Sequence, residues 1–130
     1  MQKPRIATGS DHAGVDAKNA IVQMLKAEGY EVSDKGTFSS DSVDYPDFAH
    51  AVANAVEKGE ADLGVLCCGS ANGVAITANK HAGRQHHLHC NVFCLPALVI
   101  FRPYRHRYYH VKIYQQRYLS LQVRSDAMQI

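Results

Sequence analysis

The sequence has no hydrophobic run long enough to span a membrane, since its longest apolar stretch is far shorter than the roughly 20 residues that a bilayer crossing needs. The first residues, MQKPRIATGSDHAG, also lack the apolar core of a secretory signal peptide. We therefore expect a cytoplasmic protein without membrane contact. Its length of 130 residues predicts a single domain over residues 1–130.

The placement of the cysteines argues against a disulfide framework. The chain has four cysteines, and two of them, Cys67 and Cys68, are adjacent. In a chain without a signal peptide, this arrangement fits reduced thiols. The other two, Cys90 and Cys94, lie in the histidine-rich stretch HHLHCNVFC. Structural zinc ligands usually come as two separated pairs, which this stretch does not match, so we predict no metal.

Acidic residues are nearly missing from the end of the chain. Residues 81–130 contain one acid, Asp126, against seven Lys/Arg, whereas residues 1–80 contain eleven acids against seven Lys/Arg. Five of the seven tyrosines also lie in this basic end. Basic and aromatic side chains together can bind nucleic acid. A solvated basic end is the simpler interpretation, and we predict no nucleic-acid partner.

Hydrophobic periodicity predicts strands that alternate with helices through residue 80. Gly29 and Gly59 are expected to end the first two helices, and Pro46 suits the first turn of the second. The predicted order is strand 5–8, helix 15–27, strand 30–32, a helix after Pro46, strand 61–69 and a helix from residue 71. This alternation is typical of a doubly wound α/β fold with a mostly parallel sheet.

Two polar loops are expected to meet at one edge of that sheet, because ligands of such folds bind outside the carboxyl ends of the strands. The first strand leads into Asp11 and His12, and the third leads into Cys68 and Ser70. Although they are far apart in sequence, these loops can line the same crevice.

The turn GSANG, at residues 69–73, precedes a predicted helix and offers backbone N–H groups to an anion. That anion could be a phosphate or the oxyanion of an enediolate, which would need a base nearby. Cys68 is a candidate, because thiols at helix N-termini ionise more readily than free cysteine. Simpler roles stay open, with Cys67 and Cys68 as small buried hydrophobes, Asp11 as a helix cap and His12 as a surface residue.

Three segments resemble the ribose-5-phosphate isomerase B family, which includes the galactose-6-phosphate isomerase subunits. They are GSDHAG at 9–14, DKGTFSSDSVDYPDFA at 34–49 and GVLCCGSANGVAITANKHAG at 64–83, and the resemblance covers residues 4–83. It implies a Rossmann-like three-layer α/β/α sandwich that works as a homodimer or homotetramer. It also implies interconversion of ribose 5-phosphate and ribulose 5-phosphate in the pentose phosphate pathway, without metal or other cofactor.

The resemblance also implies roles for particular residues. Cys68 would be the base that moves a proton between C1 and C2, and Ser70 with the amides of the turn would stabilise the cis-enediolate. Some family members use a glutamate on the following helix as base, but GVAITANK contains no acid. The implied substrate contacts are Asp11, His12, Tyr45, Gly69, Ser70, Ala71, Asn72 and Gly73.

The chain departs from the family pattern at one position in the turn and throughout residues 84–130. The family commonly has glycine where this chain has Ala71. After Gly83 a strand and a helix of the family pattern are missing, and RQH at 84–86 follows directly, with His86 matching the family's catalytic ring-opening histidine. Arg102, Arg105 and Arg107 are candidates for phosphate binding, and none is singled out.

The divergent end leads to two further expectations. Residues 91–100 are predicted to form another strand, and the alternation of Val111 and Ile113, continued at 119–123, is β-like where the family is helical. The C-terminal part is therefore expected to be atypical or truncated. The alternative function is a catalytically impaired or inactive isomerase-like protein, possibly a binding subunit.

Overall fold

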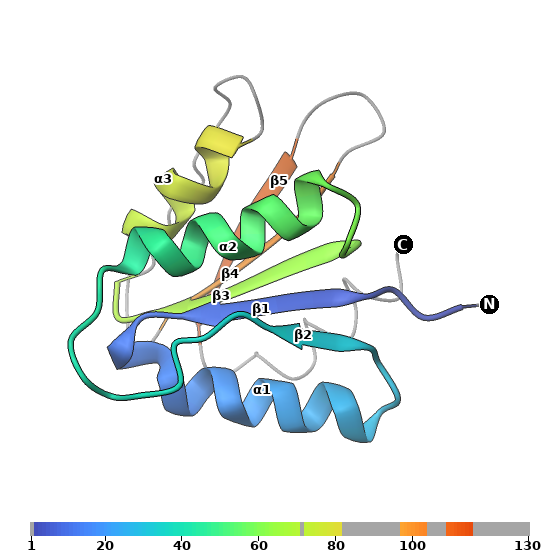
Figure 1. Ribbon diagram of the computed structural model, residues 1–130, viewed down its shortest axis with the longest axis horizontal. Helices are drawn as coiled ribbons and strands as arrows, with labels where there is room; N and C mark the ends of the chain where they lie inside the picture. Colours follow the sequence, from blue (N-terminus) through green and yellow to red (C-terminus); the bar gives the residue numbers. More distant parts are fainter. Residues whose placement is uncertain (1, 71, 82–96, 104–108, 116–130) are drawn as a thin grey trace.

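The computed structural model describes residues 2–70, 72–81, 97–103 and 109–115. The elements form one five-stranded sheet in the order β2-β1-β3-β4-β5, with helices on its faces (Figure 1). In chain order they are β1 Ile6–Ser10, the 3₁₀ helix η1 His12–Gly14, α1 Val15–Ala27, β2 Val32–Asp34, α2 Tyr45–Glu57, β3 Leu63–Cys68, α3 Asn72–His81, β4 Ala97–Pro103 and β5 Tyr109–Gln115.

The sheet has a parallel part and an antiparallel part. β1 pairs in parallel with both β2 and β3, as the alternation of strands and helices predicts. β4 runs antiparallel to β3, and β5 runs antiparallel to β4. In the described segments of the C-terminal part, β4 and β5 therefore extend the sheet as an antiparallel pair. β5 confirms the β-like alternation at Val111 and Ile113, while residues 119–123 lie outside the described residues.

Helices cover both faces of the parallel strands, which explains the nearly continuous apolar runs of β1 and β3. Figure 1 shows α1 on one face and α2 with α3 on the other. Every residue of β1 and of β3 is buried. One core cluster joins Leu66 of β3 to Val52 of α2 and Val74 of α3, and the other joins Val65 to Ile21 of α1. This is the α/β/α layering that the resemblance implies.

The observed bounds of α1 match the predicted ones, whereas β2 begins later than predicted. α1 covers residues 15–27 as predicted, and Gly29 and Gly59 adopt φ values of 81° and 73° after α1 and α2. β2 begins at Val32 instead of Tyr30. The reason is local, because the Tyr30 amide donates to Leu25 O at 3.0 Å and still belongs to the helix cap.

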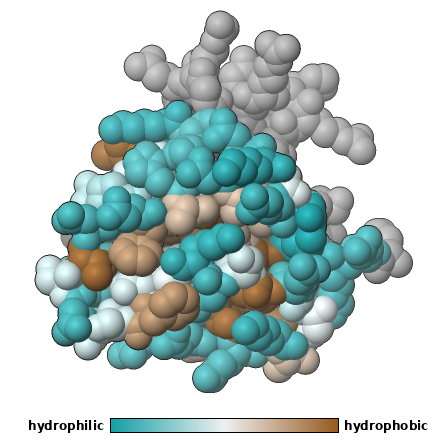
Figure 2. Space-filling model, in the orientation of Figure 1, coloured by the Kyte–Doolittle hydropathy of each residue, from teal (hydrophilic) through white to brown (hydrophobic). Residues whose placement is uncertain are grey.

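The face seen in Figure 2 is mostly hydrophilic, and its apolar areas are small and separate. Among residues with described side chains, the large hydrophobic ones that are exposed are Phe38, Tyr45 and Ile76. No helix in the described ranges has the length and apolarity that a membrane crossing requires.

Candidate functional site

Asp11 and Cys68 meet at the carboxyl ends of two neighbouring parallel strands. β1 and β3 are in register so that Ser10 pairs with Cys67. The next residue on each chain segment, Asp11 and Cys68, therefore lies at the same edge of the sheet. The Cys68 thiol donates a hydrogen bond to Asp11 Oδ2, with an S···O distance of 3.0 Å. The predicted meeting of the two loops is therefore present in the structure.

The Asp11 carboxylate is held by three donors. Oδ1 accepts from the Gly14 amide at 2.8 Å, and Oδ2 accepts from the Gly69 amide at 3.3 Å as well as from the Cys68 thiol. The side chain is buried, with 8% exposure. Asp11 is thus both the cap of η1 and a partner of Cys68, whereas the residue that caps α1 is Gly14.

Gly14 lets the first loop approach the third strand closely. A Cβ atom added to Gly14 would lie 2.4 Å from the carbonyl oxygen of Cys67 and 2.6 Å from its carbonyl carbon. That carbonyl accepts the Asp11 amide at 3.2 Å. The GSDHAG motif therefore needs its second glycine for packing. The GSDHAG motif contains Gly14, but the motif alone does not predict this close contact with Cys67.

The two adjacent cysteines face opposite sides of the sheet. Cys67 packs into the core on the α1 side, and Cys68 packs into the core on the side of α2 and α3. Both are reduced cysteines. Burial raises the pKa of the Cys67 thiol to about 12, so Cys67 stays protonated and acts as a small hydrophobe, as one interpretation of the sequence has it. Cys68 is the thiol that contacts the polar loop.

Tyr45 brings the start of α2 against the start of α3. A Cβ atom on Gly73 would lie 2.5 Å from Tyr45 Cζ, so the tyrosine ring rests directly on that glycine. Tyr45 remains 40% exposed. Its position beside the turn fits the predicted role as a lining residue, which stays a prediction.

The turn after β3 is partly described. Ser70 is exposed, as is His12 on the other loop, while Asn72 and Gly73 open α3. The Gly69 amide already donates to the Asp11 carboxylate, so it is engaged within the protein rather than open to an anion. Ala71 and His86 lie outside the described residues, and so do Cys90, Cys94 and Arg105.

Within the described side chains, no group of three or more His, Cys, Asp or Glu residues is arranged to hold a metal ion. The histidine-rich stretch at 86–94 is not part of that description. The described site consists of a thiol, a buried carboxylate and the turn that leads into α3.

The fold and the site together define an α/β protein with a thiol–carboxylate pair at the carboxyl edge of a parallel sheet. Residues 6–93 match the profile of a family described as Ribose/Galactose Isomerase, and the chain belongs to that family. Ribose-5-phosphate isomerase B of Escherichia coli (strain K12) is 52% identical over 79 residues, which are 61% of this chain and 53% of that protein. Galactose-6-phosphate isomerase subunit LacB of Clostridium acetobutylicum is 44% identical over 78 residues, or 60% of this chain and 45% of that protein.

Solved structures give the same relation. The ribose-5-phosphate isomerase B of Clostridium thermocellum superposes with a TM-score of 0.60 at 49% identity, covering 62% of this chain and 55% of that one. The Thermotoga maritima ribose 5-phosphate isomerase gives a TM-score of 0.61 at 43% identity, over 63% and 57%. The chain thus spans about half the length of the relatives that it matches.

Proposed function

We propose that this protein is an aldose–ketose isomerase that interconverts ribose 5-phosphate and ribulose 5-phosphate through a cis-enediolate, with Cys68 as base and no metal. The observation that carries the proposal is the contact of Cys68 with Asp11 at the carboxyl edge of the sheet. The relatives named as ribose-5-phosphate isomerases support the substrate class. The cytoplasm, the pentose phosphate pathway and assembly as a homodimer or homotetramer belong to the same proposal.

In this mechanism the Cys68 thiolate removes the proton from C2 of the open-chain aldose and returns it to C1, while the hydroxyl proton passes from O2 to O1. The negative charge that develops on the substrate oxygens is stabilised by Ser70 and by backbone N–H groups of the turn at the start of α3. Asp11 accepts hydrogen bonds from the sugar hydroxyls, His12 binds a hydroxyl or the phosphate, and Tyr45 lines the site. His86 is the candidate for ring opening. In the structure the Cys68 S–H bond points to Asp11 Oδ2, and this carboxylate oxygen takes the thiol proton when the thiolate forms.

A second candidate is an isomerase-like protein with impaired or no activity, possibly a binding subunit. It is favoured by the part of this chain that lies outside the match, since the match to the Escherichia coli relative covers 61% of this chain. The relatives also include a D-erythrulose-4-phosphate isomerase of Pectobacterium atrosepticum, so other sugar phosphates should be assayed beside ribose 5-phosphate.

A coupled assay of ribose 5-phosphate conversion tests the proposal, with Cys68→Ser and Cys67→Ser as a matched pair. Each replaces one buried thiol by a hydroxyl at neighbouring positions, but the two side chains lie on opposite faces of the sheet. We expect the wild-type protein and Cys67→Ser to turn over substrate and Cys68→Ser to fall to background. Wild-type turnover no higher than that of Cys68→Ser, with all sugar phosphates tried, would favour the inactive candidate.

A further inference from the structure

Lys18 is a charged side chain in a fully buried position. It lies in α1 and has 0% exposure. Among the described residues it is the largest side chain that is fully buried. Its Nζ contacts the Asp34 carboxylate at 2.9 Å to Oδ1 and 2.8 Å to Oδ2, and it lies 4.7 Å from the centroid of the Phe38 ring. The Asp34 side chain is 19% exposed, and apolar residues of similar volume often replace largely buried ion pairs without loss of stability. Stability alone therefore does not account for it.

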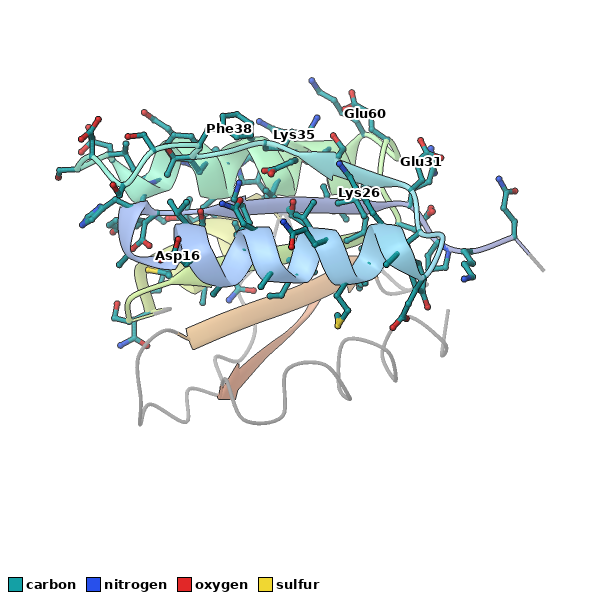
Figure 3. The ribbon with its side chains drawn as sticks, turned by 90° about the horizontal axis from the view of Figure 1, so that it is seen from below. Asp16, Lys26, Glu31, Lys35, Phe38 and Glu60 are labelled. Carbon is teal, nitrogen blue, oxygen red and sulfur yellow. The ribbon has the colours of Figure 1, made fainter. Side chains whose placement is uncertain are left out.

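The ion pair is connected to the end of β1 through the segment that follows β2. Asp34 Oδ1 accepts the Gly36 amide at 3.0 Å. Gly36 O in turn accepts the Ser10 amide at 2.7 Å, and the Thr37 amide donates to Ser10 O at 3.1 Å. Both polar backbone groups of Ser10 are thus bonded to this segment. Figure 3 shows Phe38 on the same segment, toward the carboxyl end of β1.

Ser10 is the residue before Asp11, so whatever fixes Ser10 also limits where the Asp11 carboxylate lies. We propose that Lys18 and Asp34 form a positioning pair for the candidate site, which holds Gly36 against Ser10 so that Asp11 meets the Cys68 thiol. The pair acts through Gly36 and Ser10 and is not itself a catalytic group. The kinetic part of this inference rests on the proposed isomerase function, whereas the placement of Asp11 against Cys68 does not.

The charge of Lys18 also affects the pKa of Cys67 in β3, the strand that ends in Cys68. Burial raises the pKa of the Cys67 thiol to about 12, and the Lys18 charge acts in the opposite direction. Cys67 pairs with Ser10 across the two strands and directly precedes Cys68. The buried ammonium is therefore close enough to act on Cys67, near the end of β3.

Two double variants of the full chain separate positioning from simple stabilisation. Lys18→Met with Asp34→Asn, and Lys18→Met with Asp34→Leu, both remove the two charges of the pair. Asparagine keeps an oxygen that can accept the Gly36 amide, whereas leucine does not. The measurements are thermal unfolding, kcat and KM for ribose 5-phosphate, and the rate of Cys68 alkylation by iodoacetamide at one pH, followed by peptide mass spectrometry.

We expect both double variants to fold, with the asparagine variant between wild type and the leucine variant in kcat and in Cys68 alkylation, because it keeps an acceptor for the Gly36 amide but loses the Lys18 ammonium that holds that acceptor. The leucine variant should lose at least about tenfold in kcat with KM changed less than about threefold, and its Cys68 alkylation rate should differ clearly from wild type. Equal kcat and equal alkylation in the two variants would overturn the inference.

The experiment also gives a clear result if the wild-type protein is inactive or if the leucine variant does not fold. If the wild-type protein has no isomerase activity, the proposed function fails, and the alkylation comparison alone decides the positioning role. If the leucine variant does not fold, Lys18→Met with Asp34→Ala takes its place, because alanine also lacks the acceptor for Gly36. Equal Cys68 alkylation in the alanine and asparagine variants would again overturn the inference.

Discussion

Replacing Gly14 by alanine should disturb the candidate site through a steric clash with β3. The added Cβ would lie 2.4 Å from Cys67 O and 2.6 Å from Cys67 C, both backbone atoms. The backbone of Gly14, at φ −97° and ψ 1°, does not require glycine, so the cost comes from the clash. Overpacking of this kind destabilises proteins by about 1–3 kcal/mol. Because Cys67 O accepts the Asp11 amide, relief of the clash should also move Asp11 away from Cys68.

Gly59→Ala is the matched control for Gly14→Ala. Gly59 has φ 73° and no atom within 4 Å of an added Cβ, so alanine there is strained by its backbone, by about 1–2 kcal/mol, at a place remote from the site. We expect urea unfolding to show a loss of stability for both variants. Only Gly14→Ala should alter kcat and the alkylation rate of Cys68. A Gly14→Ala protein with wild-type stability and wild-type Cys68 alkylation would refute this reasoning.

Three other predictions concern Thr8, Asp62 and Cys67. Thr8→Val should leave the urea midpoint unchanged or raise it, because Thr8 Oγ1 is buried without a hydrogen-bond partner among the described residues; a loss above about 1 kcal/mol would contradict this. Hydrogen bonding to Arg5 lowers the pKa of Asp62 from its usual value. The stability that Asp62→Asn removes should therefore be present above about pH 4 and vanish as the pH falls through the lowered pKa. A difference in unfolding free energy between the two proteins that does not change with pH would contradict this. Native Cys67 should resist iodoacetamide at pH 8 and react once urea unfolds the chain, as peptide mass spectrometry can show.

The elements with strong local signals could be predicted from the sequence. The apolar spacing and Gly29 define α1 to the residue, and the apolar run before Cys68 defines β3. The rule that loops at the carboxyl ends of parallel strands share a site correctly brought Asp11 to Cys68. These predictions succeeded because each depends on periodicity or on topology, which one sequence contains.

Contacts between distant segments could not be predicted in the same way. The buried position of Lys18 depends on its ion pair with Asp34, which belongs to another element. Hydrophobic periodicity does not predict a lysine that faces inward. The tight fit of Gly14 depends on the distance from η1 to β3. The antiparallel direction of β4 is likewise not encoded in its alternation, because parallel and antiparallel strands can share the same hydrophobic pattern.

The most direct test of the account is the exchange of substrate hydrogen with solvent. Ribose 5-phosphate is incubated in D₂O with the wild-type protein, with Cys68→Ser and with Cys67→Ser, and deuterium at C1 and C2 of the sugar phosphates is followed by NMR. The account predicts incorporation with the wild type and with Cys67→Ser, and none above background with Cys68→Ser. Incorporation by Cys68→Ser at the wild-type rate would show that another group moves the proton and would contradict the role of Cys68.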